Sequence, residues 1–484
     1  MPSVVATLQA LVVELLATNA GQQATILDLR AANARLDERV RDLETRVGQH
    51  SGNSSRPPSS DLPGTPKRPP SRPSGRGRGG QPGHVAHQRA MAPSERVDVV
   101  TDHWPLHCQA CKTVLPQAPG LPGVAGAPDF VAHQVTELPV IHPRITEHRL
   151  HRLACPSCGT RTRASLPAGV PTGSFGPRVQ ATVAMLGGRF RLSRRETSGV
   201  MGQVFGVPIS IGSVDALCQA TGEALAPVTA ALVATLPTAP LLHADETRWP
   251  HDGRIWWLWM VRSAQATVFV LSPSRGGRVI RELIGADYHG VVTSDRYAGY
   301  NWLDPAFRQL CWAHLARNFE GLVTRDGDGT HIGVWARSLI HSLFADRSAF
   351  VADRTSLRTY QLRTRQMQSG FGELLTQGTL SADLRVRRMC KGIDSLWPAL
   401  WTYLDVPGVE PTNNVAERAI RPAVLWRKGS FGTQSGSGAR FASAMLTVAA
   451  TCRMHGLDLF AYLAGVCTAS MADLAVPQLL PATA

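Results

Sequence analysis

A run of short apolar segments between residues 241 and 295 constrains the fold of this chain more than any other feature. Four segments have the length and apolar character of strands, and a helical pattern follows the third. The strands are predicted at residues 241–245, 255–261, 267–271 and 291–295, and the helix at residues 276–284. The first and last strands each end in an aspartate, Asp245 and Asp295. We therefore expect a mixed sheet with helices that carries a carboxylate at two strand ends.

A third carboxylate, Glu417, lies far downstream in a stretch with a helical pattern. Asn414 can cap that helix, and one interpretation makes Glu417 the third-position glutamate of a capping box, paired with Arg421 one turn later. The other interpretation makes it a metal-binding carboxylate among cations that bind a polyanion such as DNA. The cations of this stretch are Arg418, Arg421, Arg427 and Lys428.

Three carboxylates from separate elements suit the cleavage of phosphodiester bonds. Two divalent ions about 3.5–4 Å apart can activate a hydroxyl group and neutralise the charge of a scissile phosphate. Mg2+ and Mn2+ prefer oxygen ligands, which Asp245, Asp295 and Glu417 would provide. Glu246 is excluded as a ligand because adjacent strand residues point to opposite faces. A structural role for each aspartate, as a turn residue or a helix cap, stays open.

The charge balance indicates an anionic partner. Among 484 residues, 50 are Lys or Arg and 36 are Asp or Glu, which gives a net charge of +14. Nucleic acid is the commonest partner of so basic a chain, although ribosomal and membrane-surface proteins are also basic. No apolar run approaches the roughly 18–20 residues of a membrane span, and the N-terminus lacks the cationic segment of a signal peptide. We expect a cytoplasmic, nucleoid-associated protein without a membrane partner.

Residues 1–50 carry a heptad repeat with apolar side chains at its a and d positions, which predicts a self-associating coiled coil. The alternative is an amphipathic helix packed against its own domain. The apolar heptad positions are Val5, Leu8, Val12, Leu15, Ile26, Leu29, Leu36, Val40, Leu43 and Val47. Residues 51–95 are rich in Pro, Gly, Ser and Arg, which predicts a disordered basic linker. Arg76 and Arg78 of this linker are predicted to contact DNA phosphates, unless the segment is only a soluble tether.

Two C-x-x-C pairs follow the linker and predict a structural Zn2+ site in a module over residues 96–168. The four thiolate ligands would be Cys108, Cys111, Cys155 and Cys158, joining two hairpins, with strand-like segments at residues 130–135 and 145–150. The alternatives are a redox dithiol, or ligation by a histidine (His84, His103 or His107) in place of one thiolate. Four thiolates leave no open coordination position, which argues against a catalytic zinc.

Residues 169–237 have the pattern of helices separated by Gly and Pro. One helix is predicted to open at residues 189–196, a turn at 206–210, and a second helix at 214–225 capped by Ser213. This arrangement is compatible with a helix-turn-helix that binds DNA, although any helical hairpin gives the same pattern. Further helices are predicted at residues 334–344, 358–368, 380–389 and 439–453, and a frayed tail beyond residue 476.

Several motifs, taken in order, resemble those of transposases of the insertion sequence 66 family. Singly each motif is short, but their order along nearly the whole chain is specific. They are Asn53-Ser54-Ser55-x-Pro57-Pro58-Ser59-Ser60-Asp61, Gly80-Gln81-Pro82-Gly83-His84, the two C-x-x-C pairs, His243-Ala244-Asp245-Glu246-Thr247, Ser294-Asp295-x-Tyr297-Ala298-Gly299-Tyr300, Cys311-x-x-His314 and Asn413-Asn414-x-x-Glu417-Arg418-x-x-Arg421-Pro422, followed by Arg427-Lys428.

The resemblance implies a multidomain α+β protein with an RNase H-like α/β DDE catalytic domain over residues 238–475. A helical insertion would occupy about residues 312–405, and residues 476–484 would form the tail. The implied catalytic triad is Asp245, Asp295 and Glu417, which would use Mg2+ or Mn2+ to cleave DNA at element ends and join the freed 3′-hydroxyl to target DNA. The implied partners are DNA and companion transposition proteins. Cys311-x-x-His314, without a nearby partner pair, is interpreted as a structural feature beside the active site.

Three other functions stay open at this point. The chain is either a non-catalytic zinc-containing DNA-binding regulator, an inactive transposase, or a simple nuclease that joins no ends. Loss of cleavage with retention of DNA binding in an Asp245→Ala or Glu417→Ala variant distinguishes an enzyme from a regulator.

Overall fold

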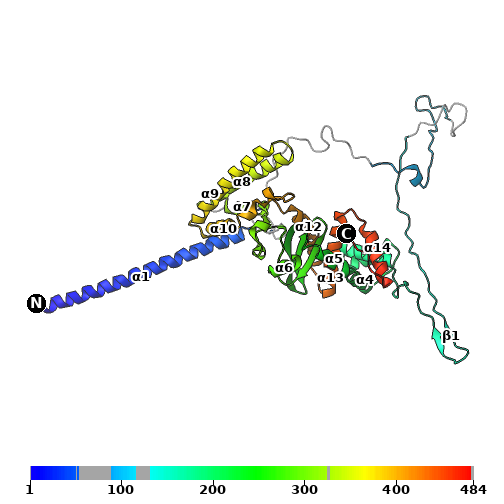
Figure 1. Cartoon of the computed structure of the whole chain (residues 1–484), viewed down its shortest axis with the longest axis horizontal. Helices are drawn as coiled ribbons and strands as arrows, with labels where there is room; N and C mark the ends of the chain where they lie inside the picture. The colour runs from blue at the N-terminus through cyan, green and yellow to red at the C-terminus, as the bar shows by residue number, and fades with distance from the viewer. Residues whose placement is uncertain are drawn as a thin grey trace. The chain divides into compact units, whose positions relative to one another are not determined.

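The computed structural model of the chain describes residues 2–50, 52–53, 61, 89–115, 131–323 and 327–480. The predicted DNA contacts Arg76 and Arg78, and the alternative zinc ligand His84, lie outside these ranges. The chain divides into two compact units. One is Pro69–Arg144, and the other combines Met1–Arg68 with Ile145–Ala484, so each is described by itself (Figure 1).

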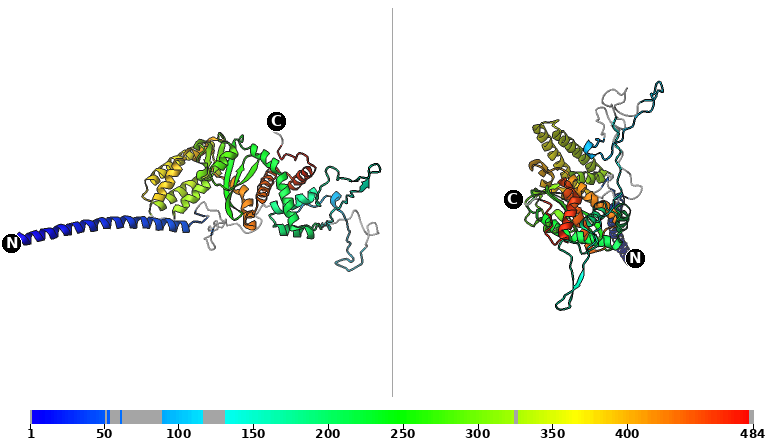
Figure 2. Two further views of the ribbon diagram at one scale, coloured as in Figure 1. Left: turned by 90° about the horizontal axis from the view of Figure 1, so that it is seen from below. Right: turned by 90° about the vertical axis from the view of Figure 1, so that its right-hand side faces the viewer.

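The heptad segment forms one long helix, α1, over Pro2–Val47 (Figure 2). Its described heptad side chains are exposed, including Leu15 at 66%, Leu29 at 59% and Leu36 at 59%. The side chains of Val5 and Arg46 are outside those described. An amphipathic helix packed against its own domain would bury this seam, so the structure favours the coiled-coil interpretation. Self-association itself stays a prediction.

The smaller unit, Pro69–Arg144, contains little regular structure in its described part. Its elements are the short 3-10 helix η2, Ser94–Arg96, and an isolated antiparallel bridge between His107 and Val114. The strand predicted at residues 130–135 is wrong for residues 131–135, which form no ladder. Gln134 instead uses its side-chain amide on the backbone of Ala92, accepting from its N–H at 2.7 Å and donating to its carbonyl at 3.0 Å.

In the larger unit, residues 145–168 contain a hairpin around the second C-x-x-C pair. Strand β1, Arg152–Ala154, pairs antiparallel with β2, Arg161–Arg163. The strand predicted at residues 145–150 is wrong, because the ladder begins two residues later. The short hairpin places Cys155 and Cys158 in the connection between the two strands.

A five-stranded mixed sheet forms the centre of the larger unit. Its order is β5-β4-β3-β6-β7, with β3, β4 and β5 antiparallel, and β6 and β7 parallel to β3. The strands are β3 Leu241–His251, β4 Arg254–Arg262, β5 Thr267–Ser272, β6 Val291–Ser294 and β7 Arg308–Leu310. Helix α6, Arg278–Ile284, connects β5 to β6 as predicted. The predicted strands are confirmed, and the fifth, β7, is an addition.

The sequence predicted that the first strand ends at Asp245, and this boundary is wrong. Strand β3 continues to His251 because its antiparallel pairing with β4 extends from His243↔Arg262 to His251↔Arg254. Its parallel pairing with β6 does stop early, at His243↔Thr293. Asp245 therefore stands at the point where one neighbouring strand ends while the other continues.

Helices on either side of the sheet share one hydrophobic core with it. The N-terminal group has α2 Pro177–Ala184, the π-helix η3 Met185–Arg189, α3 Arg194–Gln203, α4 Ile211–Ala224 and α5 Ala226–Ala234. The C-terminal group has α12 Asn414–Ser430, α13 Gly436–Met454 and α14 Leu459–Met471. The region predicted as a separate helical segment, residues 169–237, is thus packed on the sheet. Whether it binds DNA as a helix-turn-helix stays a prediction.

The helix boundaries in that region differ from the prediction. Helix α3 begins at Arg194, not at residue 189, because Ser193 and Glu196 form a capping box. Ser210, not Ser213, caps α4, since its hydroxyl accepts from the backbone N–H of Ser213 at 3.0 Å. Helices α4 and α5 together reach the length and mean hydropathy, 1.3, of a membrane span, but 39% of that window is buried inside the protein.

The described residues of the predicted helical insertion form five helices with a hydrophobic core of their own. They are α7 Trp312–Val323, α8 Asp328–Val351, α9 Leu357–Leu380, α10 Leu384–Asp394 and α11 Pro398–Asp405. The long helices α8 and α9 pack side by side (Figure 1). The helix predicted at 380–389 begins later, because Asp383 caps α10 by accepting from the N–H of Arg385 at 2.8 Å.

The C-terminal end is more ordered than the sequence predicted. The predicted last helix, residues 439–453, is α13, and α14 follows it. The predicted fraying beyond residue 476 is wrong for residues 477–480. Leu479 is buried in the core, and the hydroxyl group of Tyr462 donates to the carbonyl of Pro477 at 2.8 Å.

Candidate catalytic site

The strand register brings Asp245 and Asp295 to one edge of the sheet. β3 and β6 are parallel and pair up to His243↔Thr293, so each aspartate lies two residues beyond that pair on the same face. The pKa of Asp245 is raised well above its usual value, first by desolvation, then by the charges of Glu246 and Asp295, with Glu417 a weaker cause. The predicted carboxylates are therefore electrostatic neighbours.

A fully buried arginine holds the backbone at Asp295. The guanidinium of Arg308, on β7, donates to the carbonyl of Asp295 at 2.7 Å, the hydroxyl of Ser294 at 3.2 Å and the side-chain oxygen of Asn301 at 3.0 Å. Burial lowers its pKa to about 10, so it stays charged at neutral pH. The carboxylate of Asp295 accepts one bond, from the N–H of Tyr297 at 2.9 Å. These bonds fix the turn, and within the described chain the second carboxylate oxygen of Asp295 accepts no hydrogen bond.

Helix α12 is anchored to β3 by Asn413, the residue before its first turn. The Asn413 side chain is buried; its amide nitrogen donates to the carbonyl of Ala244 at 2.8 Å, and its oxygen lies 3.2 Å from Nδ1 of His243. Asn413 is the N-cap position but its side chain makes no capping bond. The predictions that Asn414 caps the helix and that Glu417 completes a capping box are therefore wrong.

The other end of α12 is also tied to β3. The guanidinium of Arg427 donates to the hydroxyl of Thr247 at 2.8 Å and to the carbonyl of Arg248. Beyond the helix, the hydroxyl of Thr433 lies 3.2 Å from Nε1 of Trp249. With both ends fixed, the rotation of α12 about its axis is set, and with it the direction of Glu417. Arg427 thus has a bonding role within the protein, whereas Arg418, Arg421 and Lys428 are exposed.

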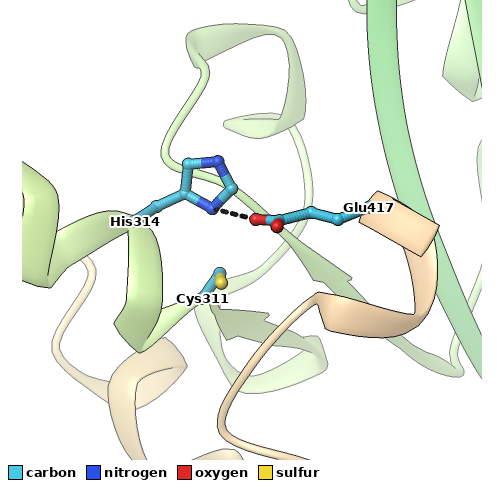
Figure 3. Close-up of side chains that lie close together, drawn as sticks. All are labelled: Cys311, His314 and Glu417. Atoms are coloured by element: carbon cyan, nitrogen blue, oxygen red, sulfur yellow. Dashed lines mark ion pairs between the residues drawn. The ribbon is translucent and has the colours of Figure 1, made fainter. Parts of the chain in front are cut away.

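The carboxylate of Glu417 faces the first turns of α7 (Figure 3). Its Oε1 lies 3.0 Å from Nη2 of Arg317 and 3.5 Å from Nδ1 of His314. Arg421, its expected partner in the structural interpretation, forms no ion pair with it in the described chain. Both contacts use the same oxygen, so Oε2 is left for another ligand. The structural interpretation is therefore wrong about the partner of Glu417.

Cys311 lies beside this pair and joins the start of the insertion to its end. Its N–H donates to the carbonyl of Ser294 at 2.9 Å, and its Sγ accepts from the N–H of Asn413 at 3.1 Å. The N–H of Trp312 donates to the carbonyl of Pro411 at 2.9 Å. The first residues of the insertion are thus bonded to the residues that follow its last helix. This explains how His314 and Glu417, which are distant in sequence, lie close together.

Cys311, His314 and Glu417 also have ligand atoms within 4.8 Å of one another, a spacing that can hold a metal ion (Figure 3). Desolvation raises the pKa of the Cys311 thiol to about 11, and desolvation and Arg317 lower the pKa of His314. The thiol and the imidazole are thus neutral at pH 7, and the guanidinium of Arg317 already neutralises Glu417. This charge balance agrees with the interpretation of Cys311 and His314 as structural residues beside the active site.

Residues 172–441 match the Transposase IS66 family. The chain belongs to this family. The matched segment contains Asp245, Asp295 and Glu417, together with the helical insertion, whereas the four paired cysteines lie outside it. Residues 3–90 match a second family, described as a family of unknown function (DUF6444).

Three relatives of this IS66-family transposase come from Sinorhizobium fredii (strain NBRC 101917 / NGR234), and each is named an uncharacterized protein. The chain is 26% identical to y4hP over 374 residues, which cover 69% of the chain and 67% of the relative. It is 23% identical to y4jD over 292 residues, covering 54% of the chain and 56% of the relative. It is 27% identical to y4qI over 202 residues, covering 37% of the chain and 35% of the relative.

Two features of the IS66 site were not identified from the sequence. Arg317 lies three residues after His314, on the same face of α7, and this spacing after Cys311-x-x-His314 is a signal that could have revealed it. The second feature is the bonding of Glu246, which the sequence analysis had only excluded as a ligand. Its carboxylate is nearly buried, accepts from Arg275 at 2.7 Å and from Tyr300 at 2.9 Å, and has a pKa raised to about 7 by desolvation and Asp295.

The two C-x-x-C pairs of the chain form turns with the same hydrogen bonds. In the first, the N–H of Cys108 donates to the carbonyl of Thr113 and the N–H of Lys112 to that of Cys108, at 2.9 and 3.0 Å. In the second, Cys155 donates to Thr160 and Gly159 to Cys155, both at 2.9 Å. Lys112 and Gly159 both have positive φ, 64° and 73°.

Each turn contains one exposed thiol with a lowered pKa. Sγ of Cys111 lies 3.2 Å from the hydroxyl of Thr113, which is the largest cause lowering the pKa of Cys111 to about 7. Thr160 likewise lowers the pKa of Cys158. A lowered pKa favours the thiolate, the form that binds zinc. Because the two turns belong to different units, a shared four-cysteine site stays a prediction.

Proposed function

We propose that this protein is a DDE transposase that binds the terminal repeats of its element, cleaves the DNA and joins the free 3′-hydroxyl end to target DNA. Family membership supports a transposase, and the arrangement of the carboxylates supports the chemistry. The mixed sheet, with three antiparallel strands and two strands parallel to the first of them, supports the α/β domain that the resemblance implies. The observation that carries the proposal is the parallel register that aligns Asp245 with Asp295, together with the bond from Asn413 that ties the Glu417 helix to the residue before Asp245.

The donor set fits two hard divalent ions such as Mg2+ or Mn2+. Asp245 and Asp295 would hold them with Glu417, and all three donors are carboxylate oxygens, as these ions prefer. Desolvation, and then the charges of Glu246 and Asp295, raise the pKa of Asp245, so a bound cation would relieve an existing electrostatic cost. Such ions would activate the attacking hydroxyl and stabilise charge on the scissile phosphate. Arg308 and Asn413 hold the aspartate turn and α12 in place.

Arg317 and His314 position Glu417 in this proposal. By bonding to Oε1 at 3.0 Å, Arg317 holds the carboxylate toward α7 and leaves Oε2 for another ligand. Its side chain is 27% exposed and that of Glu417 is 36% exposed, so DNA phosphates can also reach this guanidinium.

DNA contacts are proposed at the exposed cations of α12, Arg418, Arg421 and Lys428, and at Arg76 and Arg78 of the linker. Such contacts hold phosphates without reading sequence. The C-x-x-C turns would bind structural Zn2+, and α1 would bring two copies of the chain together. Companion transposition proteins are a further proposed partner, as the resemblance implies.

A cleavage assay separates this proposal from a DNA-binding regulator. The substrate is a duplex that carries the terminal repeat and its flanking DNA, and the variants are Asp245→Asn and, as a matched control, Asp252→Asn at an exposed turn. We expect Mg2+-dependent cleavage to fall at least a hundredfold in Asp245→Asn alone, with the Kd for DNA nearly unchanged. Equal cleavage by all three proteins would remove Asp245 from the catalytic site, and DNA binding without any cleavage would favour the regulator or an inactive transposase.

A further inference from the structure

A cavity of about 700 Å³ lies between β4, β5, α12, α13 and the segment that follows α2. Its described lining contains six arginines and no acidic residue. The arginines are Arg189, Arg191, Arg262, Arg418, Arg421 and Arg453. Within the described chain, none of the six forms an ion pair. Gathering unpaired cations costs free energy through mutual repulsion, which an anionic ligand would relieve.

The buried part of the cavity lining, its floor, is apolar: Phe269 from β5, Trp426 from α12 and Met445 from α13 are at most 8% exposed. The half-buried Ala449 follows Met445 by one turn of α13. Arg418, Arg421 and Arg453 are exposed and form the rim. The volume falls in the range of roughly 300–1,000 Å³ that is typical of sites for small organic ligands. An apolar floor beneath a cationic rim suits a ligand with one flat apolar part and one anionic part.

The backbone on one side of the cavity is unusual. Arg189 ends the π-helix η3, and Arg191 has a left-handed φ of 65°. Irregular helices and left-handed residues other than glycine cost free energy, and they concentrate at functional sites. A Cβ atom on Gly188 would lie 2.9 Å from the side chain of Met445, so glycine is needed for this close approach of η3 to α13. The strained segment therefore places two arginines at the cavity.

The cavity and the candidate site share elements, although none of the three carboxylates lines the cavity. Arg262 stands opposite His243 in the register of β3 and β4, and His243 lies two residues before Asp245. On α12, Val415 and Arg418 line the cavity and flank Glu417. Desolvation and the neighbouring charges of Arg418 and Arg453 lower the pKa of Arg262, which indicates how closely the cations gather.

We infer that this cavity binds an unpaired nucleotide of the DNA end, with its base on the apolar floor and its phosphates against the arginines. The inference rests on the proposed function. Duplex DNA presents phosphates to a cationic rim, but its paired bases cannot reach an apolar floor below that rim. A base outside the helical stack can, and stacking on apolar and aromatic side chains supplies binding energy for every base type.

The test measures binding of the full-length protein to fluorescent element-end duplexes without Mg2+, so that no cleavage occurs. Three duplexes are compared: one with blunt ends, one with two unpaired nucleotides at the end, and one with two abasic sugar-phosphates there. We expect the unpaired nucleotides to lower the Kd about tenfold relative to the blunt duplex. The abasic extension adds the same phosphates without bases, so it should recover less than half of that gain.

Variants then locate the effect. Ala449→Phe fills the floor of the cavity and should remove the tenfold preference while the Kd for the blunt duplex stays within about twofold. The paired variant Arg262→Gln with Arg453→Gln should weaken binding of the extended duplex more than that of the blunt one. Arg278→Gln, at an exposed arginine of α6 outside the cavity, is the matched control and should change neither Kd. Thermal unfolding of each variant checks that it folds.

Equal Kd values of the wild type for the three duplexes would overturn the inference, whether or not the variants fold. So would a preference that survives Ala449→Phe in a folded protein. The proposed function fails in a different way, through loss of the metal-dependent reaction or indifference to the carboxylates. A wild type that joins DNA ends without preferring unpaired nucleotides would refute this inference alone.

Discussion

At the scale of single residues, hydrogen bonding and burial shift the pKa values of exposed and buried cysteines in opposite directions. Cys111 and Cys158 are exposed and have lowered pKa values, because neighbouring threonine hydroxyls stabilise their thiolates. Cys218 is buried, and desolvation raises its pKa to about 12. The same side chain is thus either a ready metal ligand or an inert part of the core.

These differences predict a pH-dependent alkylation pattern in the metal-free protein. The pKa of Cys111 is about 7, so its thiol is mostly protonated at pH 6 and mostly thiolate at pH 8. Its alkylation by iodoacetamide should therefore accelerate roughly tenfold between these values, as followed by peptide mass spectrometry. Cys218 should stay unmodified until the protein is unfolded. Added Zn2+ should protect Cys108, Cys111, Cys155 and Cys158 together, and protection of one pair without the other would contradict a shared site.

At the scale of elements, two adjacent asparagines show how α12 is placed. The Asn413 side chain is buried and bonds to β3, whereas Asn414 is exposed. Removing a buried hydrogen-bonding group leaves its partners unsatisfied, at a cost of about 1–3 kcal/mol. Asn413 is therefore the residue that connects the Glu417 helix to the strand of Asp245.

Asn413→Ala should reduce the free energy of unfolding by about 2 kcal/mol, measured by chemical denaturation, because the carbonyl of Ala244 loses its donor. It should also reduce DNA joining, because α12 loses its anchor near Glu417. Asn414→Ala is the matched control and should change stability by less than about 0.5 kcal/mol. If the two variants behave alike, the anchoring role assigned to Asn413 is wrong.

The sequence predicted the elements that have a strong local pattern. The strands next to the carboxylates were found because apolar runs are typical of buried strands. β7 was missed because it starts with Arg308, a charged residue that is buried only through bonds to distant groups. β3 was predicted too short, since its continuation past Asp245 depends on pairing with β4. Local propensity contains neither of these tertiary effects.

The candidate site was predictable to a similar degree. The resemblance to known motifs named the three carboxylates, and the strand register places two of them side by side. The motifs did not reveal that Arg317 would bond to Glu417. These residues come together only because the start and the end of the insertion are bonded to each other in the folded protein. The cap assigned to Asn414 is wrong for the same reason, since the side chain of Asn413 bonds to β3 and not to its own helix.

At the scale of the whole molecule, the exposed seam of α1 predicts that two copies of the chain associate. Leu29 and Leu36 are each 59% exposed on a helix that carries a heptad repeat. Burying such a seam between two copies stabilises both, and asparagines at a positions favour two strands. A dimer would bring together two copies of the candidate catalytic site.

Light scattering of the full-length protein should therefore give the mass of a dimer at micromolar concentration. Leu29→Asp places a charge at a d position of the seam and should shift the protein toward monomer. Ala31→Asp places the same charge at an f position, facing solvent, and should leave the dimer intact. A dimer that survives Leu29→Asp would show that another surface holds the copies together.

The measurement that tests the central claim most directly is Mg2+-dependent joining of a pre-cleaved terminal-repeat DNA to a plasmid. The proteins compared are the wild type, Glu417→Gln, and Glu410→Gln as a matched control at an exposed glutamate that pairs with Arg347. We predict joined product with the wild type and Glu410→Gln, and at least a hundredfold less with Glu417→Gln, since the amide cannot replace a carboxylate at a metal. Equal joining by Glu417→Gln would remove Glu417 from the catalytic site and contradict the mechanism.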